Sequence, residues 1–130
     1  MKFDHHMPKG IALLRIMSGL LFLAHGTQKF LSFPAGERAG SGLGFSDPGA
    51  YAGLIELVCG VLITLGLFTR PAAFLASGTM AAAYFIAHAP QNFFPVNNGG
   101  DAAILYCFVF LCLAITGPGA WSIDGRGRRA

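Results

Sequence analysis

The chain has 130 residues, a length typical of one domain; 54% of them are hydrophobic and only 12% are charged. Nine bases and six acids are too few to cover the surface of a soluble protein of this size, so lipid is the expected solvent for most of that surface. The net charge of +3 is modest and no basic stretch is interleaved with aromatic side chains, so we predict no nucleic-acid partner.

The first apolar segment covers residues 10–33 and ends before Pro34. It is longer than the apolar part of a signal peptide, about 7–15 residues, so we interpret it as a retained membrane helix. A glycine-rich loop follows. The second segment covers residues 48–68 and begins after Ser46 and Asp47, a pattern typical of a helix N-terminus with proline in its first turn.

The third segment covers residues 71–89, between a turn at Arg70 and Pro90, which disfavours continuation of a helix. The fourth covers residues 101–117. A helix needs about 20 mostly apolar residues to cross a bilayer. The four segments therefore predict an all-α fold, a four-transmembrane-helix bundle that forms a single integral membrane domain over residues 1–130.

The distribution of Lys and Arg predicts the orientation of this bundle, because cytoplasmic loops of membrane proteins are rich in these residues. One side carries Lys2, Lys9, Arg70, Arg126, Arg128 and Arg129, whereas the other carries Lys29 and Arg38. We therefore expect both termini in the cytoplasm (N-in/C-in), and we expect the protein in a bacterial plasma (inner) membrane.

Ionisable residues inside a membrane helix are costly, so each needs a partner or a function. Arg15 lies one to two turns into the first helix, where it could snorkel to the headgroups in a structural role. Glu56 lies roughly 12 Å from the outer end of the second helix, on a face of small residues. His25 reaches a similar depth, because the first helix runs in the opposite direction.

At 100° per residue, one stripe of the first helix is expected to face protein; it comprises Arg15, Ser18, Phe22, His25, Gly26 and Lys29. Titratable and polar groups thus gather in the outer half of the bundle, which carries His25, Lys29, Glu56, Tyr84, His88 and Tyr106. Two interpretations stay open. Glu56 either relays protons or pairs with Lys29 or His25 to hold two helices together, and the remaining residues either bind a ligand or anchor the interface. Asp101 reads as a first-turn acid favoured by the helix dipole.

Several motifs, in order along nearly the whole chain, resemble those of the DoxX family. They are Arg15-x-x-x-Gly19, His25-Gly26-x-Gln28-Lys29, Glu56-Leu57-x-x-Gly60, Gly66-Leu67-x-Thr69-Arg70, Asn98-Gly99-Gly100 and Gly117-Pro118-Gly119-x-x-Ser122-Ile123-Asp124. The chain departs from the family at Asp101, where the family often has Glu. The resemblance implies a four-helix membrane bundle and a likeness to DoxD, a subunit associated with thiosulfate:quinone oxidoreductase; some members are linked to membrane-associated oxidoreductase complexes.

Three functions are compatible with these observations. The first is a redox-linked membrane subunit that binds a quinone, with Glu56 and His25 as a proton relay and with ligand-binding residues Gln28, Lys29, Tyr84, His88 and Tyr106. No metal, haem or iron–sulfur motif is present in the sequence, so a redox partner protein would supply the electrons. The second is an anchoring or assembly subunit, and the third is a small transporter, which would require a homo-oligomer. Arg15, Arg70 and Asp101 are expected to be structural.

Overall fold

The computed structural model describes residues 3–31 and 48–126; within these ranges, the side chains at 29–31, 48–50, 87, 96, 98 and 126 are not described. The capping residues expected at 46 and 47 lie outside the described residues. All regular secondary structure in the described ranges is helical. The elements in chain order are η1 (Asp4–His6), α1 (Met7–Leu31), α2 (Pro48–Leu65), α3 (Thr69–Ala83), the π-helical turn η3 (Tyr84–His88), η4 (Ala89–Gln91), α4 (Pro95–Asn98), α5 (Asp101–Thr116) and α6 (Ile123–Arg126).

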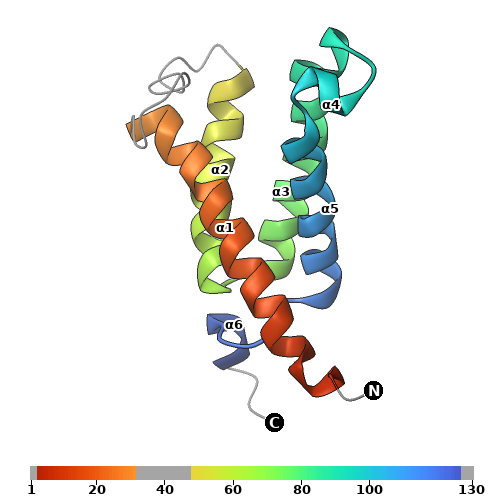
Figure 1. The fold of residues 1–130 in the computed structure, drawn as a ribbon. Helices are drawn as coiled ribbons and strands as arrows, with labels where there is room; N and C mark the ends of the chain where they lie inside the picture. The colour runs from red at the N-terminus through yellow and green to blue at the C-terminus, as the bar shows by residue number, and fades with distance from the viewer. Residues whose placement is uncertain (1–2, 32–47, 127–130) are drawn as a thin grey trace.

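The four long helices form two pairs, as Figure 1 shows. Helix α1 packs mainly on α2, and α3 packs mainly on α5, while α2 and α3 connect the pairs. We call the end of the bundle that carries both termini and α6 the terminal end, and the end where residues 92–100 connect α3 to α5 the loop end (Figure 1). The ribbons of the two pairs diverge toward the loop end.

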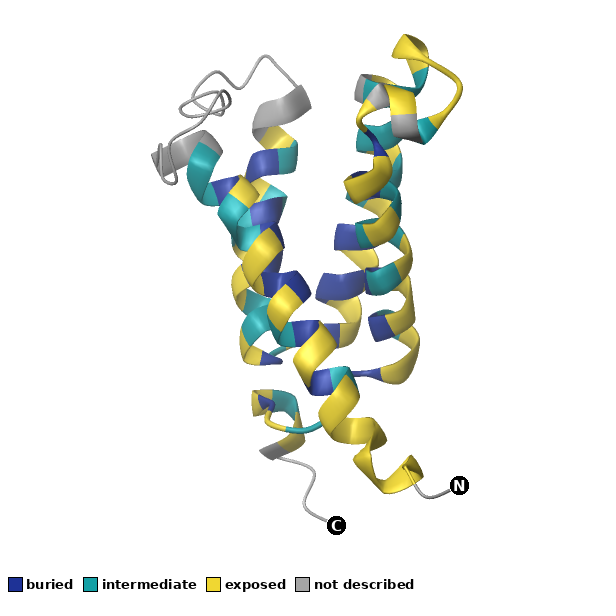
Figure 2. Ribbon diagram, in the orientation of Figure 1, coloured by how far each residue is buried: buried dark blue, intermediate teal, exposed yellow. Residues whose placement is uncertain are grey.

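The core lies where the two pairs meet, and its side chains come from all four long helices. In Figure 2, buried positions lie along the inward sides of the helices and exposed positions along their outward sides. The buried cluster consists of Phe22, Cys59, Ile63, Ala72, Ala73, Ala76, Met80, Phe110 and Leu113. Many of these side chains are small, as is usual where helices pack closely in a membrane.

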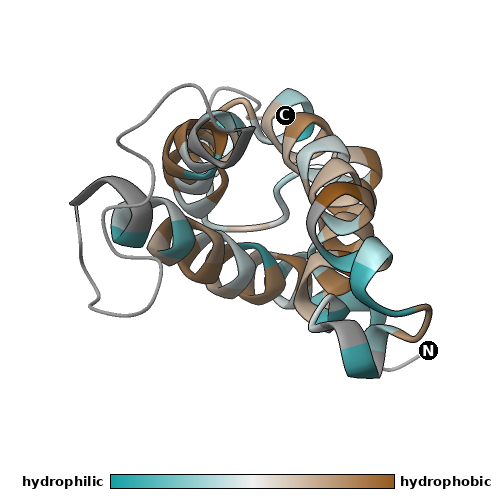
Figure 3. Cartoon of the chain, turned by 90° about the horizontal axis from the view of Figure 1, so that it is seen from above, coloured by the Kyte–Doolittle hydropathy of each residue, from teal (hydrophilic) through white to brown (hydrophobic). Residues whose placement is uncertain are grey.

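Within residues 3–31 and 48–126, two helices are long and apolar enough to cross a membrane by length and composition. They comprise Asp4–Gln28 and Thr69–Gln91, with mean hydropathies of 1.5 and 1.3. Tyr51–Leu65 and Asp101–Thr116 are apolar but shorter. Figure 3 shows hydrophobic colours on the long helices. Large apolar side chains are exposed on each of them, including Leu13, Met17, Leu21, Leu54, Val58, Val61, Phe74, Leu75, Phe85, Leu105, Phe108 and Ile115. An outward surface of this kind suits contact with lipid.

Helix α2 ends at Leu65, three residues before the end that its apolar pattern predicts. Gly66 has a positive φ of 72°. Its backbone N–H donates to the carbonyl of Ile63 at 3.1 Å, and the N–H of Leu67 donates to that of Leu62 at 2.9 Å. This pair of hydrogen bonds is the Schellman arrangement, which satisfies carbonyls at a helix C-terminus and turns the chain. The glycine, and not the following apolar residues, therefore sets the helix end.

Helix α3 begins at Thr69, two residues before the predicted start, because a residue from the end of the chain caps it. The Asp124 carboxylate accepts the backbone N–H groups of Phe68 and Thr69, both at 2.8 Å. At its other end, α3 continues through η3 and η4, so helical structure extends past Pro90 to Gln91. Proline is tolerated here because it lies in the first turn of a separate 3-10 segment, where its missing N–H is not needed.

Candidate functional site between helices α1, α2 and α5

Glycines bring the backbones of α1 and α2 into direct contact. A Cβ atom added to Gly26 would lie 2.7 Å from the backbone nitrogen of Leu57, and one added to Gly60 would lie 2.8 Å from the Cα atom of Leu23. Real Cβ atoms essentially never make contacts this short, so glycine is needed at both positions. The same approach places the backbone of Glu56 beside Gly26, with a distance of 3.1 Å from its carbonyl carbon to the added Cβ position.

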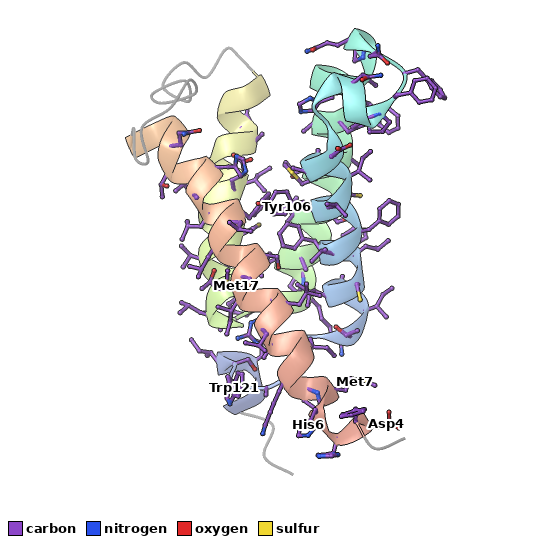
Figure 4. The ribbon with its side chains drawn as sticks, in the orientation of Figure 1. Asp4, His6, Met7, Met17, Tyr106 and Trp121 are labelled. Atoms are coloured by element: carbon purple, nitrogen blue, oxygen red, sulfur yellow. The ribbon has the colours of Figure 1, made fainter. Side chains whose placement is uncertain are left out.

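An aromatic cluster from α1 and α5 lies next to this contact. The ring centroids of Phe22 and Phe110 are 4.8 Å apart and meet edge to face, and Tyr106 stacks on Phe110 at 5.6 Å with an interplanar angle of 11°. His25 meets the Tyr106 ring edge-on at 5.9 Å, with an angle of 89°. Figure 4 shows Tyr106 between the two helix pairs. These are favoured geometries for aromatic rings, so the contacts stabilise the packing of α1 on α5.

Glu56 is the acidic member of this region. It is buried, with 4% of its surface exposed, and it interacts electrostatically with Tyr106 of α5. Its helix face is buried as well, at Gly53, Cys59, Gly60 and Ile63. We call Phe22, His25, Glu56, Tyr106 and Phe110 together the α1–α2–α5 site. It combines a flat aromatic wall, an imidazole, a phenol and a buried carboxyl group.

The expected protein-facing stripe of α1 is buried at four positions, namely Arg15, Ser18, Phe22 and Gly26, but His25 is exposed. The stripe prediction is therefore wrong for His25, which lies at the edge of the α1–α5 contact and touches Tyr106 with one ring edge. The side chain of Lys29 lies outside the described residues. Gln28 is half-buried, and it is the last residue of α1 whose side chain is described.

Tyr84 and His88 form a second ring pair, in η3 at the loop end. Their centroids are 6.4 Å apart, and Tyr84 also meets Phe85 edge-on at 5.5 Å. A Cβ atom added to Gly99, which has a φ of 73°, would lie 3.9 Å from His88 Nδ1. The connection to α5 therefore passes close to the imidazole. Asp101 is exposed in the first turn of α5, where the helix dipole stabilises a negatively charged side chain.

Arg15 is enclosed by protein, where it hydrogen-bonds to the chain's own backbone. The residue is fully buried at the terminal end. Its guanidinium donates from Nη1 to the carbonyls of Pro118 and Ala120, the latter at 3.0 Å, and from Nη2 to that of Trp121 at 2.9 Å. The backbone between α5 and α6 thus surrounds the cation, and the planar fork of donors can satisfy three carbonyls at once.

Arg70 and Asp124 complete this arrangement, which we call the terminal lock. Arg70 donates from Nη1 to the carbonyls of Ala114, at 3.3 Å, and Ile115, and from Nη2 to that of Thr116 at 3.4 Å, so it caps the C-terminus of α5. Asp124 caps α3 and interacts electrostatically with Arg15.

Sequence reasoning missed the part that Asp124 plays in the lock, and it missed the aromatic partner Phe110. For Asp124 a signal was available, since it ends the last of the DoxX-like motifs, Gly117-Pro118-Gly119-x-x-Ser122-Ile123-Asp124. Phe22 was expected on the protein-facing stripe of α1, whereas for Phe110 the sequence gives no signal beyond apolar character.

Comparison with known proteins agrees with the motifs. The DoxX family model matches residues 10–89. An uncharacterized protein of Haemophilus influenzae is 42% identical over 126 residues, which cover 95% of this chain and 94% of that protein. Inner membrane protein YphA of Escherichia coli is 32% identical, with coverage of 95% and 96%. A Bacillus subtilis protein named "Putative oxidoreductase CatD" is 30% identical, with coverage of 88% and 84%.

No solved structure matches the chain. The family model covers more than half of the 130 residues, and relatives above 30% identity align over almost their full length. The apolar outward surface of the long helices agrees with the membrane location that the name of the Escherichia coli relative states. The chain therefore belongs to the DoxX family of membrane proteins.

Proposed function

We propose that this protein is a subunit or accessory of a membrane-associated oxidoreductase system, and that its α1–α2–α5 site binds the headgroup of a quinone. The observation that carries the proposal is the near-perpendicular contact of the His25 and Tyr106 rings, together with the buried Glu56 that interacts electrostatically with Tyr106. The name of CatD, a relative called an oxidoreductase, supports the same reaction class.

The chemistry of the site suits a quinone. A quinone headgroup is a flat ring with two carbonyl oxygens; aromatic faces can stack on the ring, and N–H or O–H donors can bind the oxygens. The half-buried Tyr106 ring, backed by Phe110, can offer such a face, while the His25 imidazole and the Tyr106 hydroxyl offer donors. The quinone would enter from the lipid, in which it dissolves.

Reduction of a quinone to a quinol takes up two electrons and two protons. Glu56 and His25 are groups that can carry those protons, and a carboxyl group inside a membrane bundle is a typical member of a proton relay. A redox partner protein would supply the electrons in this proposal. The chain itself would bind and orient the quinone headgroup and deliver protons to its two oxygens.

Binding of a short-chain ubiquinone to the protein in lipid nanodiscs tests the proposal. We expect His25→Ala, Glu56→Gln and Tyr106→Phe each to weaken binding, by about tenfold for loss of one hydrogen bond to a carbonyl. Tyr51→Phe is the matched control, because Tyr51 is an exposed tyrosine of α2 outside the site. Unchanged binding in all three site variants contradicts the proposal.

An assembly subunit is the second candidate, and the terminal lock favours it. Arg15 and Arg70 both donate to backbone carbonyls of this same chain, so their charges serve the packing of the bundle. If the site has the same purpose, Glu56→Gln and His25→Ala will lower the unfolding midpoint or release a copurified protein while quinone binding stays at the background level. Mass spectrometry of gently purified complexes, which detects quinones, partner proteins and additional copies of the chain together, separates the two candidates.

A further inference from the structure

The connection between α3 and α5 exposes two large aromatic side chains at the loop end. Phe93 is 84% exposed and Phe94 is 57% exposed, and their rings meet edge to face at 5.2 Å. No Asp, Glu, Lys or Arg occurs between residues 89 and 100. A connection in water is normally polar and flexible, so an uncharged connection with two exposed phenylalanines has the composition of a segment in contact with lipid.

Helix lengths place this connection at the height of the membrane boundary. Arg70 of α3 caps the last carbonyls of α5, so the start of α3 and the end of α5 lie at the same level. From that level, Thr69–Gln91 has 23 residues and rises about 34 Å, whereas α5 has 16 residues and rises about 24 Å. The connection therefore returns over roughly the last 10 Å of Thr69–Gln91. This height is close to the limit of a hydrocarbon layer about 30 Å thick.

The backbone of the connection is organised as a low-polarity environment requires, where each unpaired N–H is costly. The Asn92 side chain accepts the backbone N–H of Phe94 at 2.9 Å, and the N–H of Asn97 donates to the carbonyl of Phe94 at 2.9 Å. Pro90 and Pro95 have no N–H. The N–H groups of Phe94 and Asn97 are thus satisfied within the connection itself.

We propose that residues 92–98 lie in the membrane interface, with Phe93 and Phe94 inserted among the lipids near the boundary between headgroups and acyl chains. The occupant of this aromatic surface is the lipid bilayer. The insertion fixes the height of the loop end, and therefore the depth of His88 beneath the connection. The proposal is independent of quinone binding and of which side of the membrane the termini occupy.

Trp121 is the sole tryptophan of the chain, which permits a direct test. In the full-length double variant Trp121→Phe/Phe93→Trp, reconstituted in phosphatidylcholine vesicles, a single tryptophan reports on the connection. We expect acyl chains brominated near the headgroup to quench its fluorescence at least twofold more than chains brominated near the bilayer centre, and we expect aqueous iodide to quench it weakly. Trp121→Phe/Phe108→Trp is the matched control, because Phe108 is exposed halfway along α5 and should show the opposite dependence on bromine depth.

Two outcomes overturn the proposal. Strong quenching by iodide without quenching by bromolipids would show that the connection lies in water. Protection from both quenchers would show that protein covers the two phenylalanines, for example a second copy of the chain. The corresponding variant with Phe94→Trp repeats the measurement at the neighbouring ring, so the result does not depend on one substitution. Far-UV circular dichroism and gel filtration verify that each variant is folded.

Discussion

Arg15 places a guanidinium in the interior of a membrane protein, where an unpaired charge is strongly unfavourable. Its three hydrogen bonds to the carbonyls of Pro118, Ala120 and Trp121 offset that cost. The same bonds attach the end of the chain to α1, together with the bond from the Ala120 N–H to the carbonyl of Pro8 at 2.9 Å. One residue of the first helix thereby determines the path of the chain more than 100 residues later.

Substitution of Arg15 should therefore destabilise the terminal end. Arg15→Met removes all three donors and leaves buried carbonyls unpaired, so we expect a loss of about 3 kcal/mol or more in the free energy of unfolding. Arg15→Lys retains the charge, but a single ammonium group cannot match the fork of the guanidinium, so we expect an intermediate loss of about 1–3 kcal/mol. Unfolding in mixed micelles with increasing SDS, followed by circular dichroism, measures both losses.

Lys9→Gln is the control for these variants, because Lys9 is an exposed cation of the same helix. It should change the free energy of unfolding by less than about 0.5 kcal/mol. An Arg15→Met variant as stable as Lys9→Gln would contradict the structural assignment of Arg15.

At the scale of the elements, close contact between α1 and α2 depends on the absence of side chains. Gly26 lies against the backbone of Leu57 in α2, and Gly60 lies against the backbone of Leu23 in α1. These backbone atoms cannot move away unless the two helices separate. Gly78 on α3 differs, because a Cβ atom added there would meet nothing within 4 Å. The chain thus contains glycines of two kinds, those required by packing and those that only lower helix propensity.

Alanine substitution should separate the two kinds of glycine. Gly60→Ala forces a methyl group against the α1 backbone, so we expect a loss of about 1–3 kcal/mol in the free energy of unfolding. Gly78→Ala restricts the unfolded chain and fills open space, so we expect no loss and a gain of up to about 1 kcal/mol. The SDS titration used for Arg15 measures both, and equal effects at the two positions would refute the close contact.

Helical character and the burial of the Glu56 face could be predicted from the sequence, because apolar composition and spacing within one helix determine both. The start of α3 could not, because Asp124 caps it from the other end of the chain. The contact of His25 with Tyr106 could not be predicted either, since it depends on how α1 and α5 rotate relative to each other. Periodicity along one helix gives no information on its neighbours.

At the scale of the whole molecule, the bundle has two different ends. At the terminal end, the lock of Arg15, Arg70 and Asp124 joins α1, α3, α5 and α6 through backbone hydrogen bonds. Toward the loop end the ribbons of the two helix pairs diverge (Figure 1). The two ends of the bundle therefore differ in how they are held together: by side-chain-to-backbone hydrogen bonds at the terminal end, and by packing within each helix pair toward the loop end.

The distribution of charge predicts the orientation of these two ends. Four helices that all cross the bilayer would put both termini on one side, together with the six Lys and Arg residues of that side, and the positive-inside rule assigns that side to the cytoplasm. We expect a green fluorescent protein fused after Ala130 to fluoresce, and alkaline phosphatase inserted within residues 36–45 to be active. The reverse pattern would invert the bundle and place the lock outside. If residue 130 and the 36–45 segment instead lie on the same side of the membrane, one of the two shorter apolar helices, Tyr51–Leu65 or Asp101–Thr116, does not span it.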